Sequence, residues 1–221
     1  MRKTRLAFSG LFLWGCAATV PGPSQVQEGW DGQLGAGKVG LYILMPRAPY
    51  TVAQFECLSQ ADDALKSLDP GIRWTSVDSG SKGVRQLGGW DLDSLGDLLL
   101  ADSAVWRLTG ANRKPRVWEG TPSLSEATRT GLVRTCRAFG VAQLVVVKPG
   151  GSRNAKDSAK SFRDPVWFGV FDSSQGSQHY SLSVPLEGAR STSRSAEADW
   201  ARQAWKTFVE GVLAIRSSRG K

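Results

Sequence analysis

The segment Arg137-Ala-Phe-Gly-Val-Ala-Gln-Leu-Val-Val-Val147 decides the fold of this chain. Gly140 is of the residue type that most often ends a helix, and it follows an amphipathic run that closes at Phe139. Residues 142–147 are then apolar almost without a break, which is typical of a strand covered on both faces. The segment therefore predicts a central strand directly after a helix, and with it an α/β fold.

Amphipathic segments on either side of this strand predict the helices that cover it. Before the strand, Ser123 and Glu126 stand three residues apart, as in a capping box that opens a helix. Near the end of the chain, apolar residues recur every three or four positions, as on one face of a helix. The predicted helices span residues 51–68, 91–106, 123–139 and 196–216.

Short apolar segments between these helices predict the strands. Residues 167–171 and 178–184 flank the turn sequence Ser-Ser-Gln-Gly176, so they predict a hairpin. The predicted strands span residues 38–45, 72–77, 142–147, 167–171 and 178–184. Helix-linked strands combined with a hairpin predict a single α/β (α+β) domain over residues 38–221, in which amphipathic helices pack a mixed sheet.

The composition is that of a folded globular protein with an excess of basic residues. The chain has 221 residues, of which 41% are hydrophobic and 22% charged, and its formal net charge is +8. Such a length suits one domain. The Lys and Arg residues are scattered, with no run of five, so the sequence predicts neither a nucleic-acid-binding stripe nor a nucleic-acid partner.

The amino terminus has the layout of a bacterial export signal. A basic start is followed by about nine mostly apolar residues, too few for the roughly 20 that a membrane span needs. We therefore expect residues 1–15 to be a signal peptide. Its removal would take away Arg2, Lys3 and Arg5 and lower the net charge from +8 to +5.

Leu13-Trp-Gly-Cys16 resembles the lipobox of bacterial lipoproteins. The resemblance implies that Cys16 is lipidated and becomes the first mature residue, while cleavage near Ala18 stays an alternative. The residue after Cys16 is Ala17 and not Asp, which is similar to the pattern of lipoproteins sorted to the outer membrane. We therefore expect the protein on the periplasmic side of the outer membrane. Residues 16–37 are rich in Gly, Pro, Gln and Ser and predict a flexible tether.

Two cysteines, Cys57 and Cys136, remain if Cys16 carries lipid. Both lie on the apolar faces of predicted helices. An oxidising compartment permits a disulfide between them. Two separate buried thiols are an equal alternative, because the sequence does not show whether their Cα atoms approach within about 7 Å.

Sequence patterns associated with catalysis occur in unsuitable places. The glycines of Gly35-Ala-Gly-Lys-Val-Gly40 match a dinucleotide-binding pattern but precede a strand instead of opening a helix. Ser79-Gly-Ser-Lys82 matches S-x-x-K without its partner motifs. His179 is the single His, and we expect it on a solvated strand edge beside Ser181. One His and three Cys exclude most metal sites, so the sequence predicts no bound metal. Because the patterns above lack their usual structural context, the sequence also predicts no catalytic residues and no cofactor.

Tryptophan supplies the candidate binding residues, because the chain has nine. We expect Trp167, in a strand, and Trp200, on the apolar side of the last helix, to lie in the core. Trp74, Trp90 and Trp118 lie in or near predicted loops, and Trp is enriched at binding hot spots. These three form the candidate surface for a protein partner or a glycan.

The carboxy-terminal half resembles a family of bacterial envelope domains. Residues 137–147 look like the family segment R-x-x-G-x-x-x-L-V-V, and Phe171-Asp-Ser-Ser-Gln-Gly176 looks like its D-x-x-x-G turn. With the long last helix, this order is similar to the amino-terminal domain of the Tol-system protein TolB and its relatives CsgG and LpoB. The resemblance covers residues 120–216 and implies a domain that acts through protein contacts, not catalysis.

Together these features predict a non-enzymatic, lipid-anchored periplasmic protein that binds or scaffolds another cell-envelope component. Its expected partners are the outer membrane, through the lipid, and a second envelope protein. A glycan or small-molecule binder that uses the loop Trp residues is one alternative. A hydrolase is another, and it would have to pair His179 with a nearby Ser.

Overall fold

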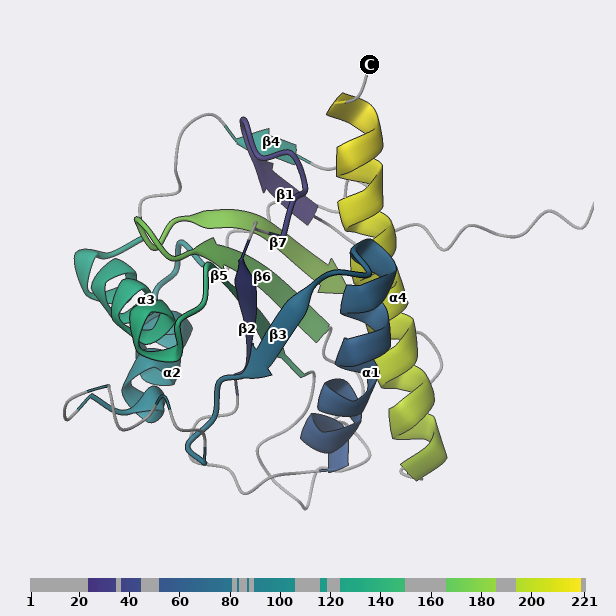
Figure 1. Ribbon diagram of the computed structural model, residues 1–221, viewed down its shortest axis with the longest axis horizontal. Helices are drawn as coiled ribbons and strands as arrows, with labels where there is room; N and C mark the ends of the chain where they lie inside the picture. The colour runs from purple at the N-terminus through teal and green to yellow at the C-terminus, as the bar shows by residue number, and fades with distance from the viewer. Residues whose placement is uncertain are drawn as a thin grey trace, which may run out of the picture.

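The computed structural model describes residues 24–34, 37–44, 52–80, 83, 87, 90–105, 116–118, 124–149, 166–185 and 194–219. Within this part of the chain, one sheet of seven strands has two helices on each face, which gives three layers (Figure 1). The fold is a single mixed α/β domain, as the sequence predicts. None of the described helices combines the length and the apolar character needed to span a membrane.

The strands follow the order β3-β2-β5-β6-β7-β1-β4 across the sheet. They are β1 (Ser24–Gln27), β2 (Lys38–Ile43), β3 (Arg73–Ser76), β4 (Arg116–Trp118), β5 (Gln143–Lys148), β6 (Val166–Asp172) and β7 (Gln178–Val184). β2 runs parallel to β3 and β5, and β1 runs parallel to β4. The other neighbours are antiparallel, and the predicted hairpin is present as β6 and β7.

The central position predicted for residues 142–147 is confirmed by β5, which lies between β2 and β6. Val145 pairs with Leu41 of β2 on one side and with Val170 of β6 on the other. Successive side chains of a strand point to opposite faces, so Val145 enters one core and Leu144 the other. Both are completely buried.

The four predicted helices are all present. Helices α1 (Val52–Leu68) and α4 (Arg194–Arg219) lie side by side on one face of the sheet (Figure 1). Helices α2 (Leu92–Ala101) and α3 (Glu126–Phe139) cover the other face. The two faces therefore have separate hydrophobic cores.

The core beneath α1 and α4 contains a cluster of aromatic rings, and side-chain hydrogen bonds link the two helices that cover it. The Trp205 ring meets the Phe168 ring edge-on, with 5.1 Å between their centroids. Its Nε1 donates to the Cys57 carbonyl at 2.9 Å. At the far end, the Arg216 guanidinium donates to the Leu68 carbonyl at 2.7 Å, an acceptor that the last turn of a helix leaves unpaired. These contacts fix α4 to α1 near the start and at the end of α1.

Leucine is the most frequent residue in the core beneath α2 and α3. Leu95, Leu99 and Leu132 are completely buried there. The Tyr42 hydroxyl, from β2, donates to the Leu92 carbonyl at 2.8 Å. This bond ties the first turn of α2 to the sheet.

The prediction of a flexible tether over residues 16–37 is wrong for residues 24–34. These residues form β1, which pairs with β7 and β4, and a packed segment in which Trp30 and Leu34 are only 6% and 4% exposed. The sequence predicts neither β1 nor β4, because both are short and their partners lie far away along the chain. A polar strand such as Ser-Gln-Val-Gln has little local signature.

Two local predictions about helix ends also need correction. α2 ends at Ala101, because the backbone of its C-cap, Asp102, is extended. The N-cap of α3 is Ser125, whose hydroxyl accepts the Thr128 N–H at 3.2 Å. The predicted cap, Ser123, lies outside the described residues.

Candidate functional site: a groove between α2 and α3

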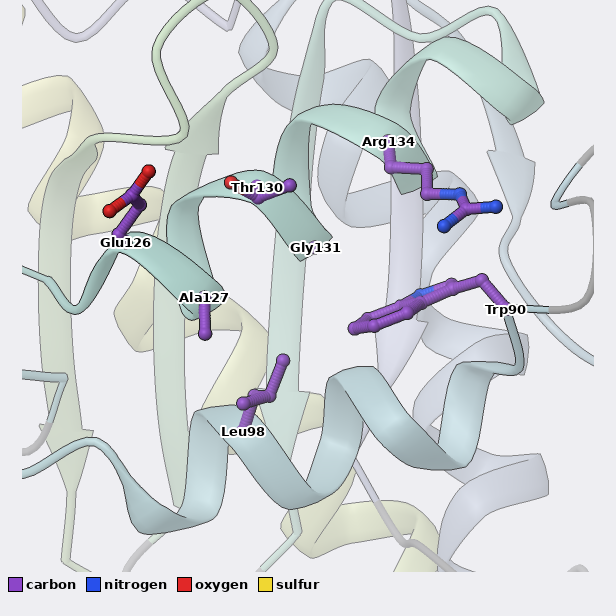
Figure 2. Close-up of a pocket in the computed structure, with 7 residues that line it drawn as sticks. All are labelled: Trp90, Leu98, Glu126, Ala127, Thr130, Gly131 and Arg134. Carbon is purple, nitrogen blue, oxygen red and sulfur yellow. The ribbon is translucent and has the colours of Figure 1, made fainter.

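An open cavity of about 610 Å³ lies between α2 and α3 on the outer side of the domain. Figure 2 shows Leu98 of α2 on one side and α3 on the other, with Trp90 at one end. We call this cavity the α2–α3 groove. It is lined by Trp90, Leu98, Glu126, Ala127, Thr130, Gly131 and Arg134.

Arg134 and Trp90 form one end of the α2–α3 groove. The Arg134 guanidinium lies over the indole, with its Cζ 5.8 Å from the ring centroid, a cation–π arrangement (Figure 2). The same guanidinium donates to the Leu87 carbonyl at 2.6 Å. The Trp90 backbone N–H donates to that carbonyl too, at 3.3 Å. Arg134 therefore holds both the ring and the backbone that carries it.

Small residues of α3 shape the wall of the α2–α3 groove. A Cβ on Gly131 would lie 2.9 Å from the Trp90 ring, so only glycine lets the indole edge pack directly on the helix. One turn earlier, Ala127 faces Leu98 across the hollow (Figure 2). Trp90 Nε1 is buried and has no hydrogen-bond partner among the described residues. The wall is thus apolar, with one unused donor at the Trp90 end.

Asp102 fixes the other end, where α2 stops and α3 begins. Its carboxylate accepts the Ser125 N–H at 2.8 Å and the Ala104 N–H at 3.0 Å. Partial burial raises the pKa of Asp102, but these hydrogen bonds and one from Thr128 outweigh it and lower the pKa below its usual value. The ionised carboxylate joins the two helices, so the α2–α3 groove has a fixed width at this end.

The two charged residues that line the α2–α3 groove lie at opposite ends of it. Glu126 is in the first turn of α3 and Arg134 is eight residues later, about 12 Å along the helix axis. Thr130 stands between them. In Figure 2, Glu126 is at the far end from Trp90 and Arg134. The lining therefore has an apolar middle, an acidic end and a basic end.

The structure separates the three candidate tryptophans, so they do not form one surface. Trp74 is on β3, one edge of the sheet, where its Nε1 donates to Asp62 of α1 at 2.9 Å. Trp118 is on β4, the opposite edge, and its side chain is not described. Trp90 lies in the α2–α3 groove, on the other face from Trp74. Trp167 and Trp200, predicted in the core, are 4% and 3% exposed.

The predicted alternative of a disulfide between Cys57 and Cys136 is wrong. Both are free and buried, Cys57 beneath α1 and Cys136 beneath α3, with the sheet between them. Burial, followed by the charge of Glu56, raises the pKa of Cys57 to about 12. Burial, followed by the charge of Asp172, does the same for the pKa of Cys136. Two thiols on opposite faces cannot meet without unfolding.

His179 is not on a solvated edge, because β7 lies between β6 and β1. Its ring stacks on Trp30 at 6.0 Å, and its Nε2 is 3.7 Å from the Asp172 carboxylate. Burial lowers the pKa of His179, against the opposing charges of Asp172 and Asp31. Its Nδ1 is buried, with no hydrogen-bond partner in the part of the chain that the structure describes.

The serines near His179 are engaged elsewhere. The Ser177 hydroxyl donates to Asp172, and the Ser181 hydroxyl accepts the Trp167 Nε1–H at 2.9 Å. Asp172 also accepts the N–H groups of Ser174 and Gln175, so its main contacts fix the β6–β7 turn. Among the described residues, neither a Ser–His pair nor a group of three potential metal ligands is present.

The sequence indicates only one residue of the α2–α3 groove in advance. Trp90 is a candidate because it is a Trp near a loop, whereas Glu126 is considered only as a cap and Arg134 not at all. The remaining signal is the pair of small residues Ala127 and Gly131, four positions apart beside the buried stripe of α3. That spacing puts them on one face, but the facing helix cannot be read from it.

Two further predictions lie outside the described residues. Cys16 with its lipobox belongs to residues 1–23, and Lys82 of the S-x-x-K pattern is also not described. Of the Gly-rich pattern, Gly40 is inside β2 and Gly37 directly precedes it, so these glycines do not open a helix.

Comparisons with known proteins add little to this geometry. No protein-family model matches the chain, and neither does any curated protein. Among solved structures, the chain is similar to a dodecamer of a point variant of PelC from Paraburkholderia phytofirmans, with 10% sequence identity. The match covers 84% of this chain and 96% of that chain with a TM-score of 0.34, too low to support an inference about fold or function.

Proposed function

We propose that this protein is a non-enzymatic, lipid-anchored domain of the bacterial cell envelope that binds another envelope protein through the α2–α3 groove. The observation that carries the proposal is the groove itself: an apolar hollow with a Trp fixed at one end and a charge at each end. Binding hot spots in proteins have this composition, with Trp and Arg prominent. The resemblance to TolB-type domains supports the same interpretation.

The position of β1 limits how far such an anchor could reach. Because β1 begins at Ser24, only residues 17–23 stand between a lipidated Cys16 and the folded domain. A chain of that length spans at most about 25 Å. The domain would therefore lie close to the membrane that holds it, and its partner would have to come to the same membrane.

Replacement of the proposed lipid site tests the anchor. Cys16→Ser should move the protein from the membrane fraction to the soluble envelope fraction, because a buried acyl chain contributes about 0.8 kcal/mol per CH₂. Mass spectrometry should show loss of the acyl mass. Cys57→Ser is the matched control, and an unchanged distribution of Cys16→Ser would contradict the anchor.

Photo-crosslinking tests the binding surface. A photoreactive phenylalanine analogue at position 130 would stand at the exposed rim of the α2–α3 groove, and the same analogue at position 202 would stand on the exposed side of α4. We expect a discrete crosslinked product in envelope preparations from position 130 alone. Equal products from both positions, or none from position 130, would contradict the proposed surface.

The α2–α3 groove suits a protein segment better than a glycan. A sugar ring needs several hydrogen-bonding groups around it, and the middle of the groove offers the hydroxyl of Thr130 among apolar side chains. One face of the Trp90 indole is also covered by Arg134. An apolar side chain from a partner protein matches this lining directly.

A further inference from the structure

We infer that the α2–α3 groove receives an amphipathic helix that runs antiparallel to α3. The helix would place an acidic residue of its first turns against Arg134, an apolar residue between Leu98 and Ala127, and a basic residue of its last turns against Glu126. The inference rests on the proposed function and specifies the partner's chemistry.

The shape of the α2–α3 groove favours a helix as its occupant. α2 and α3 are joined at one end through Asp102 and Ser125, and Trp90 packs against Gly131 near the other. They therefore form a two-helix surface with a hollow along its length. A helix packs into such a hollow by setting one row of side chains between two others, which requires axes about 8–10 Å apart. The short side chain of Ala127 permits that approach.

The charges select which helix fits. The ends of the lining carry Glu126 and Arg134, about 12 Å apart, and two turns of a partner helix cover that distance. Glu126 is exposed and has no ion pair among the described residues. On α2, Asp93 is exposed but does not line the cavity. An acidic partner residue near Trp90 must therefore lie toward α3, beside Arg134.

The direction follows from the ordinary charge distribution of helices. Acidic residues are favourable in the first turn of a helix and basic residues in the last turn, because they complement the helix dipole. Such a helix meets Arg134 with its acidic end and Glu126 with its basic end only if it runs antiparallel to α3. In the parallel direction, both ends would face like charges.

Two model peptides test the inference. Both are about 15 residues long and stapled to remain helical, since isolated helices of that length are marginal. The first has Glu in its first turn, two Leu in its middle and Lys in its last turn, and the second has Glu and Lys exchanged. By fluorescence anisotropy, we expect the full-length protein to bind the first about tenfold more tightly, with the ratio falling in high salt.

Charge variants of the protein identify the residues responsible. Glu126→Lys should reduce the preference several-fold, and Glu126→Lys with Arg134→Glu should reverse it. If replacement of Arg134 disturbs Trp90, the Glu126→Lys variant alone still tests whether charge sets the preference between the two peptides. Arg129→Glu, a charge change on another flank of α3 that does not line the cavity, should leave the ratio of the two affinities unchanged.

Several results would overturn the inference. Equal affinities, binding of neither peptide at millimolar concentration, or a preference unaffected by Glu126→Lys would each do so. A concentration-dependent dimer in sedimentation, lost in Ala127→Arg, would instead assign the α2–α3 groove to a second copy. If position 130 still crosslinks to an envelope protein while the peptides are not distinguished, the proposed function stands and this inference fails.

Discussion

Among the described residues, α1 and α4 pack against each other over one face of the sheet, which we call the closed face, whereas α2 and α3 leave a groove on the other face. The helices of the closed face have 17 and 26 residues, and those of the other face have 10 and 14. Among the described residues, the closed face also holds more of the buried aromatic side chains than the other face, with Phe168, Trp205 and Phe208 in mutual contact. The α2–α3 face relies on leucine and on polar links at the helix ends.

This difference indicates that one face contributes more to stability and the other is available for binding. Burial of large apolar side chains is the main source of folding free energy, so the α1–α4 face should carry more of the stability. The α2–α3 face devotes part of its surface to a partly buried Trp90 beneath an exposed Arg134 and to an open hollow, which stabilise the fold less but suit recognition.

The largest effect is expected from the closed face. Trp205→Ala should lower the free energy of unfolding by about 3–5 kcal/mol, because it opens a cavity among aromatic rings and removes the hydrogen bond to Cys57. Trp90→Ala should lower it less, by about 2 kcal/mol, since the ring is only partly buried and borders the open α2–α3 groove. Urea denaturation monitored by circular dichroism measures both.

A matched control for Trp205 lies on the same helix. Leu213 is 40% exposed, and Leu213→Ala should change stability by no more than about 0.5 kcal/mol. If Trp90→Ala proved as damaging as Trp205→Ala, the division between a stabilising face and a binding face would be wrong.

A smaller effect is expected from Asp172, whose turn supports the α2–α3 face. Gly176 of this turn packs so closely on α3 that a Cβ would lie 2.6 Å from the Arg129 carbonyl oxygen. Burial raises the pKa of Asp172, but hydrogen bonds from Ser174, Ser177 and Gln175 outweigh it and bring the pKa to about 2. The folded state therefore favours the ionised carboxylate.

The sign of the pH dependence follows from that lowered pKa. The stabilisation by Asp172 is complete above its unfolded pKa, near 3.8, and is lost as the pH falls toward 2. Asp172→Asn should cost on the order of 1–2 kcal/mol at pH 7, and its difference from the wild type should shrink in acid. Urea titrations between pH 7 and pH 3 measure this, with the exposed Asp199→Asn as control. A gap that stayed constant with pH would contradict the assignment.

The sequence predicts the fold well where the signal is local. The apolar run of residues 142–147, the glycine at the end of α3 and the periodic face of α4 depend on near neighbours along the chain, and β5, α3 and α4 appear as predicted. β1 and β4 are missed, because strands of four and three residues are stabilised by distant partners.

The candidate site is harder to predict for the same reason. The α2–α3 groove exists because Leu98, Ala127 and Trp90 come together from separate segments, and no single segment shows this. Cys57 and Cys136 show the same limit of local sequence patterns. Helical periodicity correctly predicts that both are buried, but only the sheet topology shows that they face opposite cores.

The smallest effect on stability, and the finest comparison of the two faces, concerns these two thiols. Cys57 lies on the buried side of α1 and Cys136 on the buried side of α3, and burial raises the pKa of each to about 12. Alkylation therefore requires local opening of the face that covers the thiol. A reductant should leave the midpoint of thermal unfolding unchanged, because Cys57 and Cys136 are both free.

Alkylation rates can then rank the two faces within one molecule. Incubation with iodoacetamide under native conditions, followed by peptide mass spectrometry, should modify Cys136 several-fold faster than Cys57. The reason is that α3 packs with a short partner helix, whereas α1 is held along its length by α4 and by the hydrogen bonds of Trp205 and Arg216. Stable faces open only in global unfolding, while less stable ones also open locally. Trp205→Ala should reduce the difference between the two alkylation rates. Faster modification of Cys57 than of Cys136 in the wild type would contradict the assignment of the α1–α4 face as the more stable one.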